Sequence, residues 1–259
     1  PEFNGFKVIA GPSTIYGEEI RELYRIMARG EFPQGRGLVS THDVAPAYVE
    51  ALSSQARLSR PLTVVVDGGN GAGGPVTTAV LEAVGARVVP LFCEPDGTFP
   101  NHHPDPVVEK NVTALVERVK ALGADCGIGL DGDGDRLGVV DETGRLMFGD
   151  QLLAIFAREV LAENPGATVI GEVKCSHLAY KDIAAHGGKP VMGATGHSLI
   201  KARMQETGAL LAGEMSGHMF FADRYMGFDD ATYAAMRFLE VLDRHPDRKA
   251  STLLSDWPK

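Results

Sequence analysis

LTVVVDGGNGAGGPVTTAVLEAVGARVVPLF, residues 62–92, is the stretch that decides the fold class. The β-branched run at 62–66 is typical of a buried strand, which Asp67 and a glycine-rich turn bring to an end. Apolar residues at 76–84 then follow helical spacing, and residues 88–92 return to strand character. A strand, a helix and a second strand in this order predict a parallel α/β unit.

The same alternation continues towards the C-terminus. It predicts an α/β protein with two successive three-layer domains and mostly parallel sheets, at residues 44–146 and 147–259. Residues 1–43, with an amphipathic helix expected at 16–29, are interpreted as the C-terminal tail of a further α/β domain. Further strands are expected at 126–130, 137–140, 168–173, 190–192 and 210–213, and further helices at 112–122, 150–162, 178–186 and 198–207.

Composition and charge narrow the class of protein. The 259 residues carry a formal net charge of -9, which disfavours binding to nucleic acid. The longest apolar runs are far shorter than the ~20 residues that a membrane helix needs. The three cysteines lack Cys-x-x-Cys spacing, which argues against a disulfide framework or a zinc site. We therefore expect a cytoplasmic protein with neither nucleic acid nor membrane as a partner. Pro1 follows no initiating Met, so we expect the chain to begin inside a longer protein.

The sharpest local signal is Asp131-Gly-Asp133-Gly-Asp135-Arg136, which lies between two expected strands. Alternating Asp and Gly allows a tight turn to direct three carboxylates at one divalent cation, and Mg²⁺ suits such ligands. Arg136 would offer a forked donor to a phosphate on the same ion. A solvated acidic turn is the plain alternative. An EF-hand is rejected, because Arg136 occupies the position that requires Gly and the flanks are strands.

The glycine-rich turn supports a different kind of protein. Gly69, Gly71 and Gly74 match G-x-G-x-x-G between a strand and a helix, and Glu94 follows the next strand, where a ribose ligand could lie. A nicotinamide-dependent oxidoreductase is therefore an alternative, although any α/β unit can use glycine in its first turn.

Several separated motifs, in the same order, carry a resemblance to a known family. They are Asn4-Gly-Phe-Lys7, Asp67-Gly-Gly-Asn-Gly71, Pro100-Asn-His-His-Pro-Asp-Pro106, Asp131-Gly-Asp-Gly-Asp-Arg136, Lys174-Cys175, Thr195-Gly-His-Ser198 and Gly213-Glu-Met-Ser-Gly-His218. With these motifs the chain resembles the α-D-phosphohexomutases of the phosphomannomutase/phosphoglucomutase type. The matched part is the central portion, from the end of the first domain through the third.

The resemblance implies roles for ten residues. Asp131, Asp133 and Asp135 would bind Mg²⁺. The implied catalytic residues are Lys7, Arg136 and His197, and the implied substrate-binding residues are Lys174, Glu214, Ser216 and His218. Glu214 and Ser216 would grip sugar hydroxyls, and the Met between them resembles mannose and glucose enzymes more than amino-sugar enzymes. The generic alternative for these two residues, considered without the family, is a pair that caps the start of a helix.

The implied activity is reversible intramolecular phosphoryl transfer between hexose 1-phosphate and hexose 6-phosphate, for mannose and glucose, through a phosphoserine and a sugar bisphosphate. The family's Thr-x-Ser-His-Asn-Pro loop and its final phosphate-binding domain have no copy in this chain, and Ser198 is not expected to replace that serine. We therefore expect the chain to be inactive alone. The alternatives are a phosphoglucosamine mutase, an NAD(P)-dependent oxidoreductase, and a noncatalytic module that binds metal or phosphosugar.

Overall fold

The computed structural model describes residues 8–11, 13–15 and 17–258 and divides the chain into two compact units. The smaller unit ends at Val44 and contains the antiparallel pair β1 (Ile9–Ala10) and β2 (Ser13–Thr14), followed by helix α1 (Glu18–Arg29). Helix α1 confirms most of the helix expected at 16–29. It ends where Gly30 adopts a left-handed conformation, with φ 69°.

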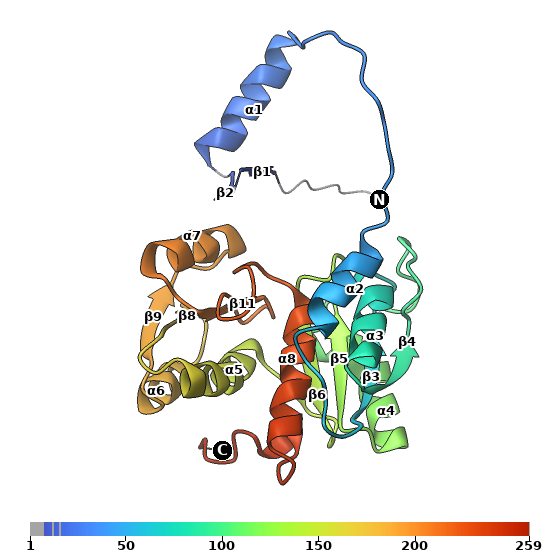
Figure 1. Cartoon of the computed structure of the whole chain (residues 1–259), viewed down its shortest axis with the longest axis vertical. Helices are drawn as coiled ribbons and strands as arrows, with labels where there is room; N and C mark the ends of the chain where they lie inside the picture. The colour runs from blue at the N-terminus through green and yellow to red at the C-terminus, as the bar shows by residue number, and fades with distance from the viewer. Residues whose placement is uncertain (1–7, 12, 16, 259) are drawn as a thin grey trace. The chain divides into compact units, whose positions relative to one another are not determined.

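The larger unit, Ala45–Lys259, contains two sheets (Figure 1). The first has the strand order β4-β3-β5-β6-β7, in which β4, β3 and β5 are parallel and β6 and β7 are antiparallel to their neighbours. Its strands are β3 (Thr63–Asp67), β4 (Arg87–Leu91), β5 (Cys126–Leu130), β6 (Leu137–Asp141) and β7 (Leu146–Met147). The short acidic loop after β5 returns the chain as a hairpin, so this sheet is mixed.

Helices cover both faces of this sheet, as the alternation of side chains along β3 requires. Val64 and Val66 join the core beneath helix α3, whereas Val65 joins a separate cluster with Leu115 and Val119 of helix α4. The covering elements are α2 (Ala45–Ser53), α3 (Gly73–Ala83), the short 3-10 helix η1 (Glu109–Val112) and α4 (Thr113–Leu122). The strand, helix and strand predicted at 62–92 are thereby confirmed.

The second sheet has the order β11-β10-β8-β9, with β10, β8 and β9 parallel and β11 antiparallel. Ile170 packs with Ile200 and Met204 of helix α7 on one face, and helices α5 and α6 cover the other. The elements are α5 (Gly149–Glu163), β8 (Thr168–Glu172), α6 (His177–Ala185), β9 (Lys189–Gly193), α7 (His197–Thr207), β10 (Leu211–Gly213) and β11 (Met219–Phe221).

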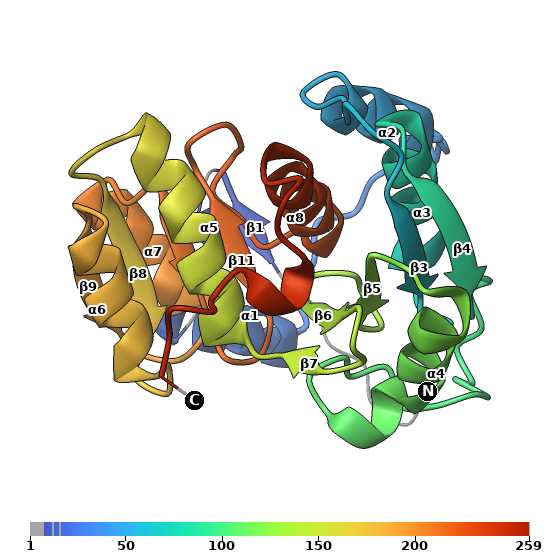
Figure 2. The same cartoon turned by 90° about the horizontal axis from the view of Figure 1, so that it is seen from below.

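Helix α8 (Ala231–Arg244) joins the two sheets (Figures 1 and 2). It contacts α3 and β6 on one side and α5 and β11 on the other, and its buried apolar side chains belong to a single core cluster that extends through both sheets. A 3-10 helix, η2 (Ala250–Thr252), follows it. Neither α8 nor α2 was predicted from the sequence. Within the described part of the chain, no helix is both long and apolar enough to cross a membrane.

Candidate active site

The acidic loop folds around the carboxylate of Asp131, which is almost completely buried. One of its oxygens accepts hydrogen bonds from the backbone amides of Gly134, Asp135 and Arg136, at 3.0, 3.1 and 3.1 Å. The other accepts one from Nε of Arg136, at 2.7 Å. Burial is the main reason that the pKa of Asp131 rises to about 6. The four hydrogen bonds to the carboxylate of Asp131 fix the conformation of the turn.

Three carboxylates converge at this loop, as the sequence predicts. Asp131, Asp133 and Asp135 each offer an oxygen, and these oxygens lie within 4.8 Å of one another. Asp133 is exposed, so the group is open to solvent on one side. This donor set fits a hard divalent cation that keeps some of its water. Arg136 is held beside it by Asp131 and by Asp105, at 3.3 Å.

The glycine-rich turn packs directly against the acidic loop. A Cβ atom on Gly71 would lie 2.7 Å from the carbonyl oxygens of both Asp131 and Gly132. The amide of Ala72 donates a hydrogen bond of 3.0 Å to Gly132. Carbonyl oxygens thus occupy the place where a pyrophosphate would approach in a dinucleotide site. The glycines serve close packing here, which removes the structural basis of the oxidoreductase alternative.

The loop after β10 closes onto the acidic loop. Residues 214–218 form a tight turn in which Glu214 and His218 share a backbone hydrogen bond of 3.0 Å. The carbonyl of Gly217 accepts a hydrogen bond of 3.0 Å from the amide of Leu137, and Arg136 and His218 form an isolated β-bridge. The predicted metal ligands and the predicted sugar-binding residues therefore lie in adjoining loops.

Two buried carboxylates organise the C-terminal edge of the second sheet. Oε1 of Glu214 accepts a hydrogen bond of 2.7 Å from the amide of Gly196, the residue directly before α7. The side chain of Glu214 therefore does contact the start of a helix. Glu172, at the end of β8, is completely buried. It accepts hydrogen bonds from the amide of Met215 at 3.0 Å and from the hydroxyl of Thr195, and its carboxylate lies 3.2 Å from Nζ of Lys174.

Two histidines gather around Asp229. The rings of His197 and His218 are stacked, 5.8 Å apart. Oδ2 of Asp229 lies 3.1 Å from Nδ1 of His218 and 3.7 Å from Nδ1 of His197, and Oδ1 lies 3.2 Å from Nζ of Lys201. Nδ1 of His218 is also 3.6 Å from Asp135. This Asp229 cluster connects the histidines to the acidic loop.

The charges of the cluster shift two pKa values. Burial would raise the pKa of Asp229, but the close approach of His218 and the positive charge of Lys201 outweigh it and hold this pKa below its usual range. Burial would lower the pKa of His218, but Asp229, Asp135 and Glu214 together raise it. At neutral pH the carboxylate of Asp229 is therefore ionised.

The chain matches two family models, described as phosphoglucomutase/phosphomannomutase, alpha/beta/alpha domain II, over residues 46–144, and domain III, over residues 148–259. The chain belongs to the phosphoglucomutase/phosphomannomutase family.

Similar proteins agree with this family and also show its extent. The phosphomannomutase/phosphoglucomutase of Pseudomonas aeruginosa is 46% identical over 258 residues, which are 100% of this chain and 56% of the relative. A phosphoglucomutase of Neisseria gonorrhoeae is 45% identical over 93% of this chain and 53% of its own length. A crystal structure of a family protein from Burkholderia thailandensis, 46% identical, has a TM-score of 0.90 over 95% of this chain and 54% of its own. The chain thus spans about half the length of the curated relatives that it matches.

Of the ten residues to which the resemblance assigns a role, the structure describes nine, and most of these lie in neighbouring loops. Lys7 lies outside the described residues. Arg136 and His218 meet at the acidic loop, and His197 reaches the same place through Asp229. Lys174 is 54% exposed and so is accessible to an anion, and Ser216 is half-buried in the turn that begins at Glu214.

No site role was assigned from the sequence to four side chains near these loops, Glu172, Asp229, Asp67 and His102, and His102 was interpreted as structural. Asp67, at the end of β3, lies 3.0 Å from Nε2 of His102, a residue that sits in the proline-rich motif before η1. Burial raises the pKa of Asp67. The strand-end positions of Asp67 and Glu172 are the signal that could have identified them, because ligands collect at the carboxyl ends of parallel strands.

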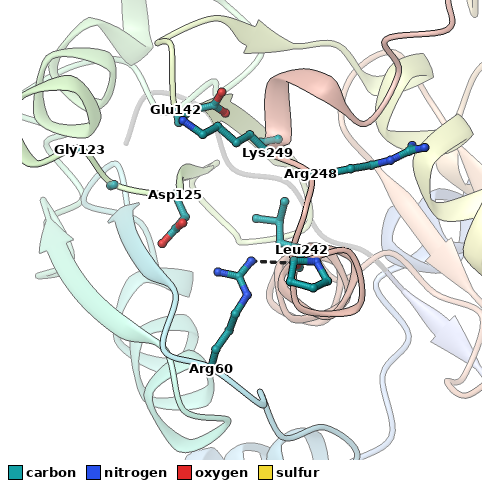
Figure 3. A pocket seen from close by; sticks show the side chains of 10 residues that line it. Arg60, Gly123, Asp125, Glu142, Leu242, Arg248 and Lys249 are labelled. Carbon is teal, nitrogen blue, oxygen red and sulfur yellow. Dashed lines mark hydrogen bonds between the residues drawn. The ribbon is translucent and has the colours of Figure 1, made fainter.

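A separate pocket of about 320 Å³ lies at the other end of the first sheet (Figure 3). Asp125 directly precedes β5 and Glu142 directly follows β6, so the pocket is at the strand ends remote from the acidic loop. Arg60 spans it and donates a hydrogen bond of 2.9 Å to the carbonyl of Leu242 near the end of α8. Charges of both signs line this pocket, so it lacks the uniformly positive surface that a phosphate favours.

Proposed function

We propose that the complete protein interconverts hexose 1-phosphates and hexose 6-phosphates, of mannose and glucose, through a phosphoserine and a sugar bisphosphate. The observation that supports this most is the hydrogen bond between Leu137 and Gly217, because it joins the acidic loop to the turn that contains Glu214 and Ser216. Phosphoryl chemistry needs a metal site next to the place that holds the sugar. We also propose that residues 44–146 and 147–259 are its second and third domains and that it is cytoplasmic.

We propose that Asp131, Asp133 and Asp135 hold Mg²⁺. The bound ion supplies charge stabilisation to the phosphoryl group. The convergence of three oxygens within 4.8 Å, with Asp133 exposed, supports an ion that keeps room for water and for a phosphate oxygen. Ion pairs to Asp131 and Asp105 fix Arg136 beside that place, so its remaining donors would meet the phosphate without further ordering.

The remaining basic groups would position the anionic substrate. Lys174 extends into solvent, and the rings of His197 and His218 face Asp229 through Nδ1, beside the acidic loop. Glu214 and Ser216 would read sugar hydroxyls from the turn beside the metal loop. Lys7 stays a prediction as a proton carrier. A phosphoglucosamine mutase is the second candidate, and the residues of this turn would decide between the two.

The test uses the complete protein, including the serine loop and the final domain. With Mg²⁺ and a sugar bisphosphate present, we expect it to convert mannose 1-phosphate to mannose 6-phosphate. The conversion is monitored by ³¹P NMR. Glucose 1-phosphate should be converted as well, and glucosamine 1-phosphate at least tenfold more slowly. The matched control is residues 1–259 alone, for which we expect no turnover. Preference for the amino sugar would support the second candidate, and no turnover of any sugar phosphate by the complete protein would refute the proposal.

A further inference from the structure

The side chain of Glu172 contacts residues of three different loops. It ends β8, the strand between β10 and β9, so the loops after all three parallel strands surround it. Its carboxylate is bonded to Thr195 after β9 and to Met215 after β10, and it pairs with Lys174 after β8. Each of these loops carries a residue proposed to contact the substrate.

Both the backbone and the side chain of Glu172 are fixed. Its carbonyl accepts hydrogen bonds from the amide of Cys175 at 2.9 Å and from the hydroxyl of Tyr180 at 2.7 Å. The side chain has no exposed surface. A charged carboxylate is costly to bury unless its oxygens are satisfied, and here both oxygens have partners. Because its side chain is completely buried, Glu172 cannot contact a substrate directly.

We propose that Glu172 is the positioning residue of the sugar-recognition loops. It fixes the amide of Met215, and thereby the direction of the side chains of Glu214 and Ser216 on either side. Through Thr195 it also fixes the segment that leads to His197. The inference rests on the proposed function for its effect on the sugar, but the linkage of the loops is independent of that function.

The variants separate positioning from charge. Glu172→Gln keeps the Oε1 acceptor for Met215 and an amide that can donate to the hydroxyl of Thr195, but it removes the charge. Glu172→Ala removes the contacts of the carboxylate and keeps those of the backbone carbonyl, and Thr195→Val removes one carboxylate contact with little change of volume. The matched control is Asp141→Asn, at the end of β6 that is remote from the acidic loop. Asp141 is another buried carboxylate that accepts hydrogen bonds from backbone amides, those of Thr143 and Arg145.

The experiment measures hydrogen exchange of the Met215 amide, KM and kcat for mannose 1-phosphate, and Mg²⁺ affinity in the complete protein. For Glu172→Ala we expect at least tenfold faster exchange and a KM raised by roughly tenfold, with kcat changed less and Mg²⁺ affinity within twofold, because a lost buried partner costs on the order of a factor of ten. Glu172→Gln should restore KM to within about threefold of the wild type.

Several results would overturn the inference. These are an unchanged KM in a folded Glu172→Ala protein, a Glu172→Gln protein as impaired as Glu172→Ala, or an equal rise of KM in Asp141→Asn. If Glu172→Ala does not fold, Thr195→Val decides, with faster Met215 exchange and a KM raised roughly threefold as the supporting result. A wild-type protein without mutase activity would refute the proposed function, and slow Met215 exchange that accelerates in the variants would still support the linkage.

Discussion

The amide of Leu137 donates a 3.0 Å hydrogen bond to the carbonyl oxygen of Gly217, which connects the first residue of β6 to the turn after β10. Gly217 has φ 96°, and a Cβ atom there would lie 2.6 Å from the carbonyl oxygen of Leu137. Only glycine combines this backbone conformation with this approach. The close approach of these two segments at the candidate site therefore requires glycine at position 217.

Gly217→Ala should lower the free energy of unfolding by about 3 kcal/mol, because it adds a steric clash to an unfavourable φ. Gly166 is the matched control, since it has φ 82° and a Cβ atom there would meet nothing within 4 Å. Gly166→Ala should cost only about 1 kcal/mol. Urea unfolding of both variants measures the difference. Equal losses in the two would contradict the close approach at Gly217.

Mg²⁺ should stabilise the chain through the acidic loop. At a concentration of about 100 times its Kd, the ion should raise the free energy of unfolding by about 2.7 kcal/mol. Asp133→Asn should weaken Mg²⁺ binding roughly tenfold or more with little effect on the ion-free protein, because Asp133 is exposed. Calorimetric titration measures the affinity. The control is Asp247→Asn, also at an exposed site, and an equal loss there would speak against the site.

Asp229→Asn should destabilise the protein by about 2 kcal/mol at pH 6 to 7, because it removes the charge that faces Lys201 and His218. The folded-state pKa of Asp229 is lowered, so its stabilisation is present above the ordinary carboxyl pKa and is lost as pH falls through the lowered value. The difference between wild type and variant should therefore shrink below about pH 4. Thermal unfolding at pH 6.5 and at pH 3.5 tests this, and a gap that widens in acid would refute it.

Arg237 should be among the most costly residues to replace on helix α8. It is 5% exposed, pairs with Asp223 at 2.9 Å and lies over the ring of Phe221 at 4.7 Å. Arg237→Met should cost about 3 kcal/mol, because it leaves the charge of Asp223 buried.

The control for this variant is Arg203→Met, an exposed residue of α7 that pairs with Glu206 and should cost less than about 0.5 kcal/mol. In the background of Arg237→Met, Asp223→Asn should recover part of the loss, as a double-mutant cycle by urea unfolding would show. Additive losses would contradict a coupled pair.

The sequence predicts the repeating strands and helices of this fold, but neither the direction of β6 nor the helices α2 and α8. Periodicity identifies β3, α3 and β4, because buried strands and helices leave repeating apolar patterns. It carries no information on strand direction, so the antiparallel course of β6 emerges only from the short loop at 131–136. Helices α2 and α8 belong to no strand–helix–strand repeat and were not predicted.

The candidate site divides in the same way. The acidic loop is local, and three alternating carboxylates indicate a shared ligand within five residues. Glu172 is different, because its partners Thr195 and Met215 are 23 and 43 residues away and a single Glu at a strand end has no pattern of its own. The roles of all ten candidate residues stay predictions.

The packing of Gly71 against the acidic loop also affects which ions the loop can accept. Because the carbonyls of Asp131 and Gly132 touch the glycine turn that begins α3, the loop cannot expand without displacing that helix. Ca²⁺ needs ligand distances about 0.3 Å longer than Mg²⁺ and more ligands. If the loop holds Mg²⁺ as proposed, this backing would disfavour the larger Ca²⁺, and Gly71, which would touch neither ion, would contribute to the discrimination between them.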